Sequence, residues 1–445
     1  MDTPICDFVK KYAKSDCLRL HMPGHKGKNF LGFEHLDVTE FDGADNLFSA
    51  NGIIKKSQEN ASAIFGANTF YSTEGSSLSI RAMLFLAVKF AREKGIRPLI
   101  FASRNAHRAF ISACATIDFE VQWLYGNNQS YLSCNISAID IDKAISALEQ
   151  KPVAVYLTSP DYLGNTLDIR NISKVCKKHG VLLLVDNAHG AYLKFLTPSL
   201  HPIDLGADMC CDSAHKTLSA ITGAGYLHIS KNAHSFFKEN VQDAMALFSS
   251  TSPSYLILQS LDILNAYLSS DYAKDLNECV IKVDNLKKAL INNGYTLVGN
   301  EKLKICINAK KYGYLGEQLN KILSQKNIVC EFYDKDFIVF MFSPQTLSSD
   351  FKLLESALLS INKKQELLEQ SPTCLRAKKA LSIRQATMLP SKKIKVEDAN
   401  GKIIAESSLS CPPAVSVAVS GEVIDGDVIS ALKYYGFEYC KVDKD

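Results

Sequence analysis

Four short apolar runs in this sequence are each followed directly by side chains capable of acid–base or nucleophilic chemistry. The polar segments are Arg-Asn-Ala-His at 104–107, Thr-Ser-Pro-Asp-Tyr at 158–162, Asp-Asn-Ala-His at 186–189 and Asp-Ser-Ala-His-Lys at 212–216. Apolar runs of this kind are typical of strands buried on both faces, as in a parallel sheet. Ligands bind just beyond the carboxyl ends of such strands, so the four segments are predicted to meet at one edge of a sheet.

The residue types at this edge match the needs of pyridoxal phosphate. Lys216 can supply an amine for the cofactor aldehyde, and Asp186 can supply a carboxylate that keeps the ring nitrogen protonated. His107 is a flat group that can stack on the ring. These three and His189 are the predicted catalytic residues, and Thr158 is added as a cofactor contact.

A phosphate site is predicted where a helix over 77–95 begins. Gly75, Ser76 and Ser77 lie at this start, where backbone N–H groups and the helix dipole favour an anion. Ser213 and His215, which flank Lys216, are predicted to complete the phosphate site.

Each of these features also has an ordinary structural explanation. A single Ser-x-His-Lys is usually a solvated turn, and serine at a helix start more often caps the helix. His107 alone would more often be structural. Asp186 and His189 could be a metal pair, but no third ligand follows at metal spacing, so no metal site is predicted. The joint pattern favours the cofactor site.

The surrounding pattern predicts an α/β fold. Strands are expected at 98–102, 153–157, 181–185, 209–211 and 226–229, separated by helical segments. We expect an N-terminal segment at 1–45 and a large cofactor-binding domain with a mostly parallel sheet at 46–235. A smaller α+β domain follows at 236–365, and a C-terminal α+β segment with a turn at Pro412-Pro413 at 366–445.

Composition excludes several other classes of protein. The 445 residues are 47% hydrophobic and carry a formal charge of +3 without a long basic run, so neither nucleic acid nor membrane is an expected partner. The 13 cysteines include no Cys-x-x-Cys pair and indicate reduced, buried thiols. With no signal-peptide pattern at the start and no membrane span, the expected location is the cytoplasm.

The sequence resembles the prokaryotic-type Orn/Lys/Arg decarboxylases, in their short form. The resemblance extends over nearly the whole chain, and five motifs carry it: 21–27 (His-Met-Pro-Gly-His-Lys-Gly), 37–43 (Asp-Val-Thr-Glu-Phe-Asp-Gly), 104–107, 186–191 and 213–218. It implies an aspartate-aminotransferase fold with the cofactor on Lys216 and its ring nitrogen on Asp186. It also implies that His107 and Ala188 cover the two ring faces, and that Ser76, Ser77, Ser213 and His215 hold the phosphate.

The resemblance further implies a homodimer or larger assembly with shared sites. Thr251 resembles the residue that such enzymes lend to the phosphate of a neighbouring subunit. Glu422 is similar to the family's candidate for the distal cation of the substrate, and Asp45 is expected to assist it.

The sequence departs from the family pattern near two of these residues. The family usually has Asp-Glu-Ala-His-Gly-Ala-His, whereas this chain has Asn187 and Tyr192 at the second and last positions. The family's Gly-Ile-Pro and Pro-Gly-Glu are replaced by Ala-Val-Ser at 414–416 and Ser-Gly-Glu at 420–422. These changes bear on the identity of the substrate.

The expected reaction is loss of CO2 from arginine, lysine or ornithine, which yields a polyamine precursor. Two alternatives are left open. Another reaction on the same fold, such as transamination, would use the same cofactor residues. A catalytically degenerate homologue would instead regulate a true decarboxylase, although the presence of Lys216, Asp186 and His107 argues against it.

Overall fold

The computed structural model of the chain describes residues 1–126, 130–373, 375–406, 409–411 and 414–444. They form two compact units, each built from two stretches of chain. The first unit contains Met1–Ile96 and Leu182–Leu276, and the second contains Arg97–Val181 and Asn277–Asp445. The predicted division of the chain into four segments stays a prediction. The predicted turn at Pro412-Pro413 lies outside the described residues.

The strands of the first unit are hydrogen-bonded in the order β1-β7-β6-β5. Strands β5 and β6 are parallel, whereas β7 is antiparallel to both β6 and β1. Their bounds are β1 (Asn68–Ser72), β5 (Leu182–Asp186), β6 (Met209–Asp212) and β7 (Gly225–Ile229).

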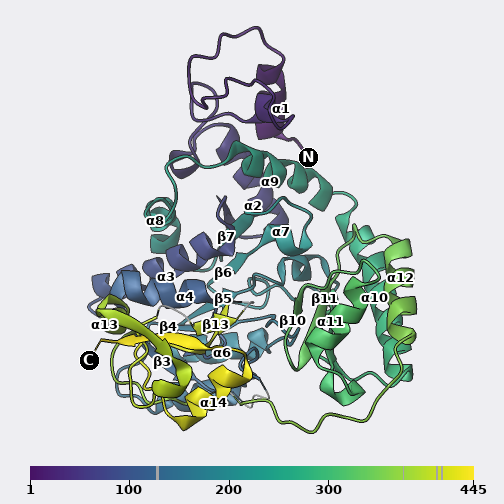
Figure 1. The fold of residues 1–445 in the computed structure, drawn as a ribbon. Coiled ribbons are helices and arrows are strands. Elements are labelled where there is room, and N and C mark those ends of the chain that lie inside the picture. Colours follow the sequence, from purple (N-terminus) through teal and green to yellow (C-terminus); the bar gives the residue numbers. More distant parts are fainter. Residues whose placement is uncertain (127–129, 374, 407–408, 412–413, 445) are drawn as a thin grey trace. The chain divides into compact units, whose positions relative to one another are not determined.

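Helices cover these strands in the first unit. Helix α3 packs against β6, β7 and α8, and helices α1, α2 and α9 pack on one another (Figure 1). Their bounds are α1 (Pro4–Ala13), α2 (Ile53–Phe65), α3 (Gly75–Glu93), α7 (Ala214–Thr217), α8 (Ser235–Ala246) and α9 (Tyr255–Leu268). Helix α3 forms because apolar residues recur at helical spacing along it, and it buries Leu78, Met83 and Leu86.

The N-terminal part of the second unit contains three parallel strands in the order β4-β2-β3. All five residues of β2 are buried, as its unbroken apolar sequence predicts. The bounds of the elements are β2 (Leu99–Ser103), α4 (Arg108–Ala113), β3 (Glu120–Leu124), α5 (Ala138–Ser146), β4 (Ala154–Thr158) and α6 (Ile169–His179).

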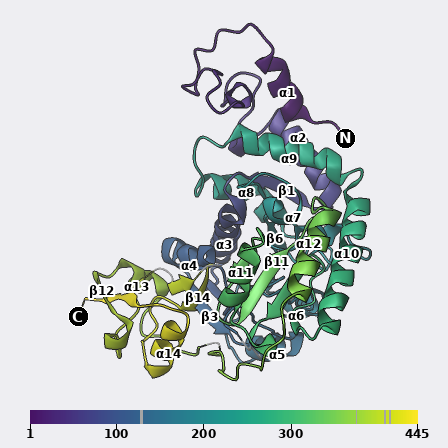
Figure 2. The same cartoon turned by 45° about the vertical axis from the view of Figure 1, so that its right-hand side comes forward.

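The rest of the second unit contains an antiparallel sheet, β10-β11-β9-β8, and two pairs of strands, β12-β15 and β13-β14. Helices α10, α11 and α12 lie near β11 (Figure 2). The bounds are α10 (Tyr272–Asn292), which begins in the first unit, β8 (Leu297–Val298), β9 (Lys304–Asn308), α11 (Gly316–Ser324), β10 (Phe332–Tyr333), β11 (Phe337–Met341), α12 (Ser348–Leu359), α13 (Ile383–Met388), β12 (Ser391–Lys395), β13 (Leu409–Cys411), β14 (Val415–Ala418), α14 (Gly426–Tyr434) and β15 (Tyr439–Asp443).

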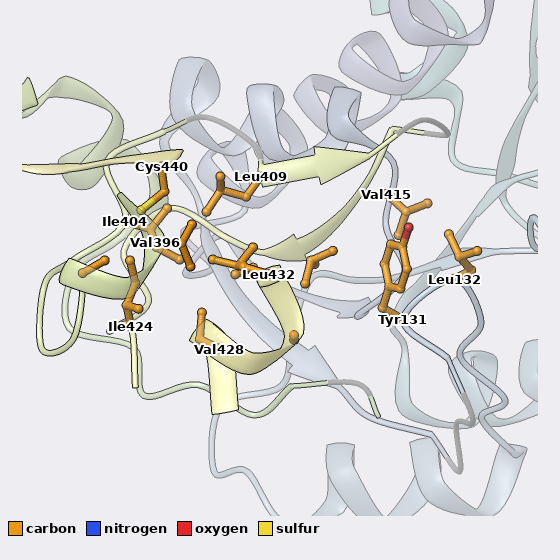
Figure 3. Close-up of a cluster of buried hydrophobic side chains, with 14 of the residues drawn as sticks. Tyr131, Leu132, Val396, Ile404, Leu409, Val415, Ile424, Val428, Leu432 and Cys440 are labelled. Atoms are coloured by element: carbon orange, nitrogen blue, oxygen red, sulfur yellow. The ribbon is translucent and has the colours of Figure 1, made fainter. Parts of the chain in front are cut away.

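A buried cluster ties the C-terminal segment to the rest of the second unit. Figure 3 shows Leu432 of α14 with Val396 and Ile404 on one side, and Val415 of β14 beside Tyr131. The same cluster includes residues of β9, β10 and β11. The C-terminal segment therefore shares a hydrophobic core with the preceding parts of this unit.

The structure confirms the α/β class and all five predicted strands, with no bound shifted by more than one residue. The strand predicted at 226–229 is β7, which runs antiparallel to both its neighbours. Residues 213–224, which connect β6 to β7, contain only the single helical turn of α7, whereas a parallel connection usually runs through a longer helix. In the part of the chain that the structure describes, no helix is both long and apolar enough to span a membrane.

Candidate active site

Strands β5 and β6 bring Asp186 and the segment before Lys216 to the same edge. They are parallel, and Asp186 pairs with Cys211 in their register. The ladder continues one residue further, because the N–H of Asn187 donates to the carbonyl oxygen of Cys211 at 3.0 Å. Both strands therefore end side by side, as the sequence predicted.

The two predicted proton-transfer groups, Lys216 and His189, are in direct contact. The Nζ atom of Lys216 lies 3.0 Å from Nε2 of His189. The histidine is 6% exposed, and the lysine is half-buried in the one-turn helix α7. An amine and an imidazole at this distance share one hydrogen bond, so a proton can pass between them.

Asp186 is buried and held in a fixed orientation. Its Oδ1 atom accepts a hydrogen bond from the N–H of Ala188 at 3.2 Å and one from the thiol of Cys211 at 3.5 Å. Burial raises the pKa of Cys211 well above its usual value, so the thiol keeps its proton and acts as a donor. A carboxylate with 2% exposure in this setting is suited to a cationic ring nitrogen.

The predicted phosphate residues gather at the start of α3. Gly75 has a φ of +64° and donates its N–H to the carbonyl oxygen of Gly223 at 2.7 Å. A Cβ atom on Gly75 would lie 3.5 Å from Cε1 of His215, so the two residues are neighbours. Ser76 is buried and Ser77 half-buried in the first turn of the same helix.

The first turn of α3 is not capped by the residue before it. The carboxylate of Glu74 accepts hydrogen bonds from Oγ of Ser249 at 2.9 Å and from N–H of Ser250 at 2.8 Å instead. The side chain of Glu74 therefore makes no capping hydrogen bond to the first turn of α3, and a helix start of this kind suits a phosphate. Ser213 is buried and precedes α7, and Nδ1 of His215 lies 2.9 Å from the carbonyl oxygen of Ala224.

His107 and Thr158 belong to the second unit, and their predicted contacts with the cofactor stay predictions. His107 precedes α4, and its Nδ1 accepts a hydrogen bond from the N–H of Ala109 at 3.1 Å. Thr158 is the last residue of β4, and its N–H donates to Oγ of Ser103 at 3.3 Å. His107 therefore follows β2 and Thr158 ends β4, so both lie near strand ends of this unit.

Asp45 and Glu422 have protein partners that differ from the predicted substrate contact. Asp45 accepts hydrogen bonds from five backbone N–H groups, those of Asn46, Asn51, Gly52, Ile54 and Lys55. Burial raises the pKa of Asp45, but these N–H groups outweigh burial and hold the pKa below its usual value. This carboxylate organises the loop that leads into α2.

Glu422 is 3% exposed and forms an ion pair with Arg104, with 3.2 Å between Oε2 and Nη2. Its Oε2 also accepts the N–H of Val419 at 2.8 Å, and Arg104 Nη1 donates to the carbonyl oxygen of Ser416 at 3.1 Å. Burial raises the pKa of Glu422, while Arg104 opposes that shift. The substrate role of Glu422 stays a prediction, and these contacts favour a structural role.

Thr251 is exposed in the loop that precedes α9. Its contact with a neighbouring subunit stays a prediction. The two residues before it, Ser249 and Ser250, attach this loop to Glu74, directly before the predicted phosphate site.

Sequence reasoning missed several residues of the first unit that support the site. Cys211 was interpreted only as an apolar strand residue, although it donates to Asp186. Asp212, His201 and His228 form a buried cluster with Asn187. The acidic Asp212 at the end of an apolar run was a signal, but its histidine partners are distant in sequence.

The fold and these side chains define a pyridoxal-phosphate enzyme of the aspartate-aminotransferase class. An amine on Lys216, a buried carboxylate at the end of the neighbouring strand and a helix start without a side-chain cap are groups that suit this cofactor. Solved structures share the fold. The constitutive lysine decarboxylase of E. coli has a TM-score of 0.79 and 18% identity, covering 100% of this chain and 82% of that chain. A lysine decarboxylase of Francisella novicida has a TM-score of 0.79 and 18% identity, covering 99% and 81%.

Residues 3–308 match the family model for the Orn/Lys/Arg decarboxylase major domain. The chain belongs to this family and is a pyridoxal-phosphate-dependent decarboxylase of a basic amino acid. An arginine decarboxylase of Bacillus subtilis (strain 168) is 29% identical over 467 residues, covering 97% of this chain and 93% of the relative. One from Halalkalibacterium halodurans is 28% identical over 456 residues, covering 95% and 91%.

Proposed function

We propose that the substrate is L-arginine and that Lys216, His189 and Asp186 carry out its decarboxylation. The observation that carries this proposal is the contact between Lys216 and His189 beside the buried carboxylate of Asp186 on the neighbouring strand end. The curated relatives named arginine decarboxylases support the choice of arginine over lysine and ornithine.

When bound, pyridoxal phosphate supplies an aldehyde and a conjugated cationic ring that accepts the electrons released with CO2. Lys216 would supply the amine that holds the cofactor through its aldehyde. Asp186 keeps the ring nitrogen protonated, and the donors from Ala188 and Cys211 keep its carboxylate pointed in one direction. This electrostatic contribution acts most strongly as charge moves into the ring.

Lys216 and His189 act as the proton relay. The Nζ atom of Lys216 lies 3.0 Å from Nε2 of His189, so the amine and the imidazole can share a proton. The pair can therefore deliver a proton to the carbon that has lost the carboxylate and be reprotonated through His189. His107 and Ala188 are proposed to cover the two faces of the ring, and Thr158 to add a polar contact.

The phosphate is proposed to bind at the start of α3. Ser76 and Ser77 would supply N–H and hydroxyl donors beside Gly75, and His215 and Ser213 would approach from α7. The positive φ of Gly75 supports this proposal, because it turns the chain sharply at the point where a phosphate would come close to the backbone.

We also propose a homodimer in which Thr251 serves the phosphate site of the partner subunit. The cytoplasm is the proposed location, and its support is that the eleven cysteines whose side chains the structure describes are all free thiols. Decarboxylation of arginine yields agmatine, so the product would be a polyamine precursor.

A substrate comparison tests this function. Purified protein with bound cofactor is incubated separately with L-arginine, L-lysine and L-ornithine, and both CO2 and keto-acid formation are measured. We expect CO2 and agmatine from arginine at a kcat/KM at least about tenfold above the other two substrates, the scale of one charged contact. Keto acid without CO2 would indicate an aminotransferase, and no product with any of the three would contradict the proposal.

A further inference from the structure

Asp212 is the centre of a buried polar cluster that the roles proposed above do not use. It is the last residue of β6 and is 0% exposed. Its Oδ1 accepts a hydrogen bond from Nδ2 of Asn187 at 2.7 Å, and its Oδ2 lies 3.1 Å from Nε2 of both His201 and His228. Three N–H donors from three other segments therefore meet on one carboxylate.

The hydrogen-bond pattern indicates the protonation of Asp212 and His228. Burial raises the pKa of Asp212, but the two histidines outweigh burial and hold the pKa well below its usual value. Burial lowers the pKa of His228, and the hydroxyl of Thr69 lies 2.9 Å from its Nδ1. A neutral His228 thus accepts from Thr69 at Nδ1 and donates to Asp212 at Nε2.

The cluster also includes a thiol. Sγ of Cys210 lies 3.9 Å from Nε2 of His201, and these atoms and the carboxylate of Asp212 all lie within 4.8 Å of one another. Burial raises the pKa of Cys210 well above its usual value, so the thiol remains protonated. The 3.1 Å separations have the N···O length of hydrogen bonds.

The cluster explains the amide at position 187. The family pattern has glutamate there, and a carboxylate at this point would face Asp212 across a hydrogen-bond distance. Two carboxylates at such a distance cannot both ionise without a large cost. Asn187 instead donates to Asp212, so the pair keeps one acid and one amide.

We propose that Asn187 and Asp212 are positioning residues that fix the spacing between Asp186 and Lys216. Asn187 follows Asp186 directly, and Asp212 precedes the segment that ends in Lys216. Their side-chain bond adds to the backbone bond from Asn187 to Cys211, so two bonds lock the ends of β5 and β6 together. The inference rests on the proposed roles of Asp186 and Lys216.

The first test is Asn187→Asp, which exchanges the donor for a second carboxylate of nearly equal size. Its folded state must hold an extra proton, so the pKa of the new acid is raised above its unfolded value of about 3.9. The folded Asn187→Asp protein is therefore more stable at low pH, where the new acid keeps its proton, and becomes less stable as the pH rises. Other titratable or charged groups near the cluster are Cys210, Tyr226, Asp186, Asp204 and Lys194.

We expect the Asn187→Asp protein to melt about 5 °C or more below wild type at pH 8.5, with a smaller difference at pH 5. The matched control is Asn171→Asp, which also places an acid beside an aspartate, since Nδ2 of Asn171 lies 2.6 Å from Oδ2 of Asp168. Both control residues are exposed, so that variant should melt like wild type at both pH values. A loss in Asn187→Asp that does not change with pH would overturn the inference.

The second test is rescue by the exchanged pair, Asn187→Asp with Asp212→Asn. This double variant restores one acid and one amide, so its melting temperature should rise from that of Asn187→Asp most of the way to the wild-type value. The spacing between Asp186 and Lys216 is tested by the visible absorbance of the bound cofactor, measured as a function of pH. The midpoint of this titration should shift by at least about half a pH unit in Asn187→Asp and return to the wild-type value in the double variant. If Asn187→Asp yields no folded protein, a folded double variant with the wild-type midpoint supports the inference.

A double variant that is no better than Asn187→Asp would overturn the inference, as would stoichiometric metal in the purified wild type. An unshifted midpoint in Asn187→Asp would also overturn it. Failure of the proposed function is distinguishable, because the substrate comparison would then fail with wild type while the pH dependence of melting in Asn187→Asp remained.

Discussion

Nζ of Lys216 lies 3.0 Å from Nε2 of His189, although the two residues follow different strands of the sheet. His189 comes three residues after the end of β5, and Lys216 comes four residues after the end of β6. The parallel pairing of β5 and β6 brings them together. One hydrogen bond thus links the proposed cofactor lysine to the proposed proton donor.

Replacing the proposed cofactor lysine should remove both the cofactor band and turnover. We expect Lys216→Ala to lose the visible absorbance, because the amine of Lys216 is the group that bonds the aldehyde. Its kcat/KM should fall by more than about 10²-fold. The control is Lys231→Ala, which changes an exposed lysine of the same unit. Retention of the band in Lys216→Ala would mean that another amine holds the cofactor.

His189→Gln tests the proton relay. Glutamine keeps a polar group next to Lys216 but cannot exchange a proton near neutral pH. We expect kcat to fall by about 10²-fold, the usual scale for a general acid or base, with the cofactor band retained. Stopped-flow and steady-state assays with arginine would measure it. A wild-type kcat in this variant would rule out His189 as the donor.

Asp186→Asn tests the partner of the ring nitrogen. The amide has the same shape but no charge, so the ring nitrogen is no longer kept protonated and accepts electrons less well. We expect cofactor to remain bound while kcat/KM falls by roughly 10²–10³-fold, a loss typical of one electrostatic contact in an active site. Near-normal turnover would contradict the role of Asp186.

The strands and the residues that follow them could be predicted from the sequence because both depend on local patterns. Unbroken apolar runs mark buried strands, and Asp186 and Lys216 each lie within a few residues of one. The partners of Asp212 could not be found in this way, because His201 and His228 reach it from other segments through tertiary packing.

The contacts of Glu422 show the same limit more sharply. A glutamate near a motif suggested a substrate contact, but its ion pair with Arg104 joins residues 318 positions apart. Likewise, nothing local to Asp45 indicated that the backbone of 46–55 would supply its donors. Family motifs can indicate which residues matter, while the partner of a buried charge depends on the whole fold.

Glu422→Gln distinguishes a structural role from a substrate role. Loss of one member of a buried ion pair leaves Arg104 uncompensated, so we expect the free energy of unfolding to fall by about 3–5 kcal/mol, measured by denaturant titration. The KM for arginine should stay near that of wild type. A tenfold higher KM with unchanged stability would instead support the substrate role predicted from the sequence.

Asp45→Asn should weaken the fold in a pH-dependent way. The pKa of Asp45 is lowered in the folded state, so its contribution is present above the unfolded pKa of about 3.9 and is lost as pH falls through the lower folded pKa. We expect wild type to be more stable than Asp45→Asn at pH 7, by about 1–3 kcal/mol, and the difference to shrink in acid. Equal stability at pH 7 would show that the five N–H contacts contribute little.

The central claim is that Lys216 holds the cofactor, and chemical reduction tests it most directly. Borohydride converts the bond between the lysine amine and the cofactor aldehyde into a stable link, and mass spectrometry of the digested protein then identifies the labelled residue. The account predicts that the peptide containing Lys216 carries the cofactor mass at close to one label per chain. A label on any other lysine, or no label in protein that shows the cofactor band, would contradict it.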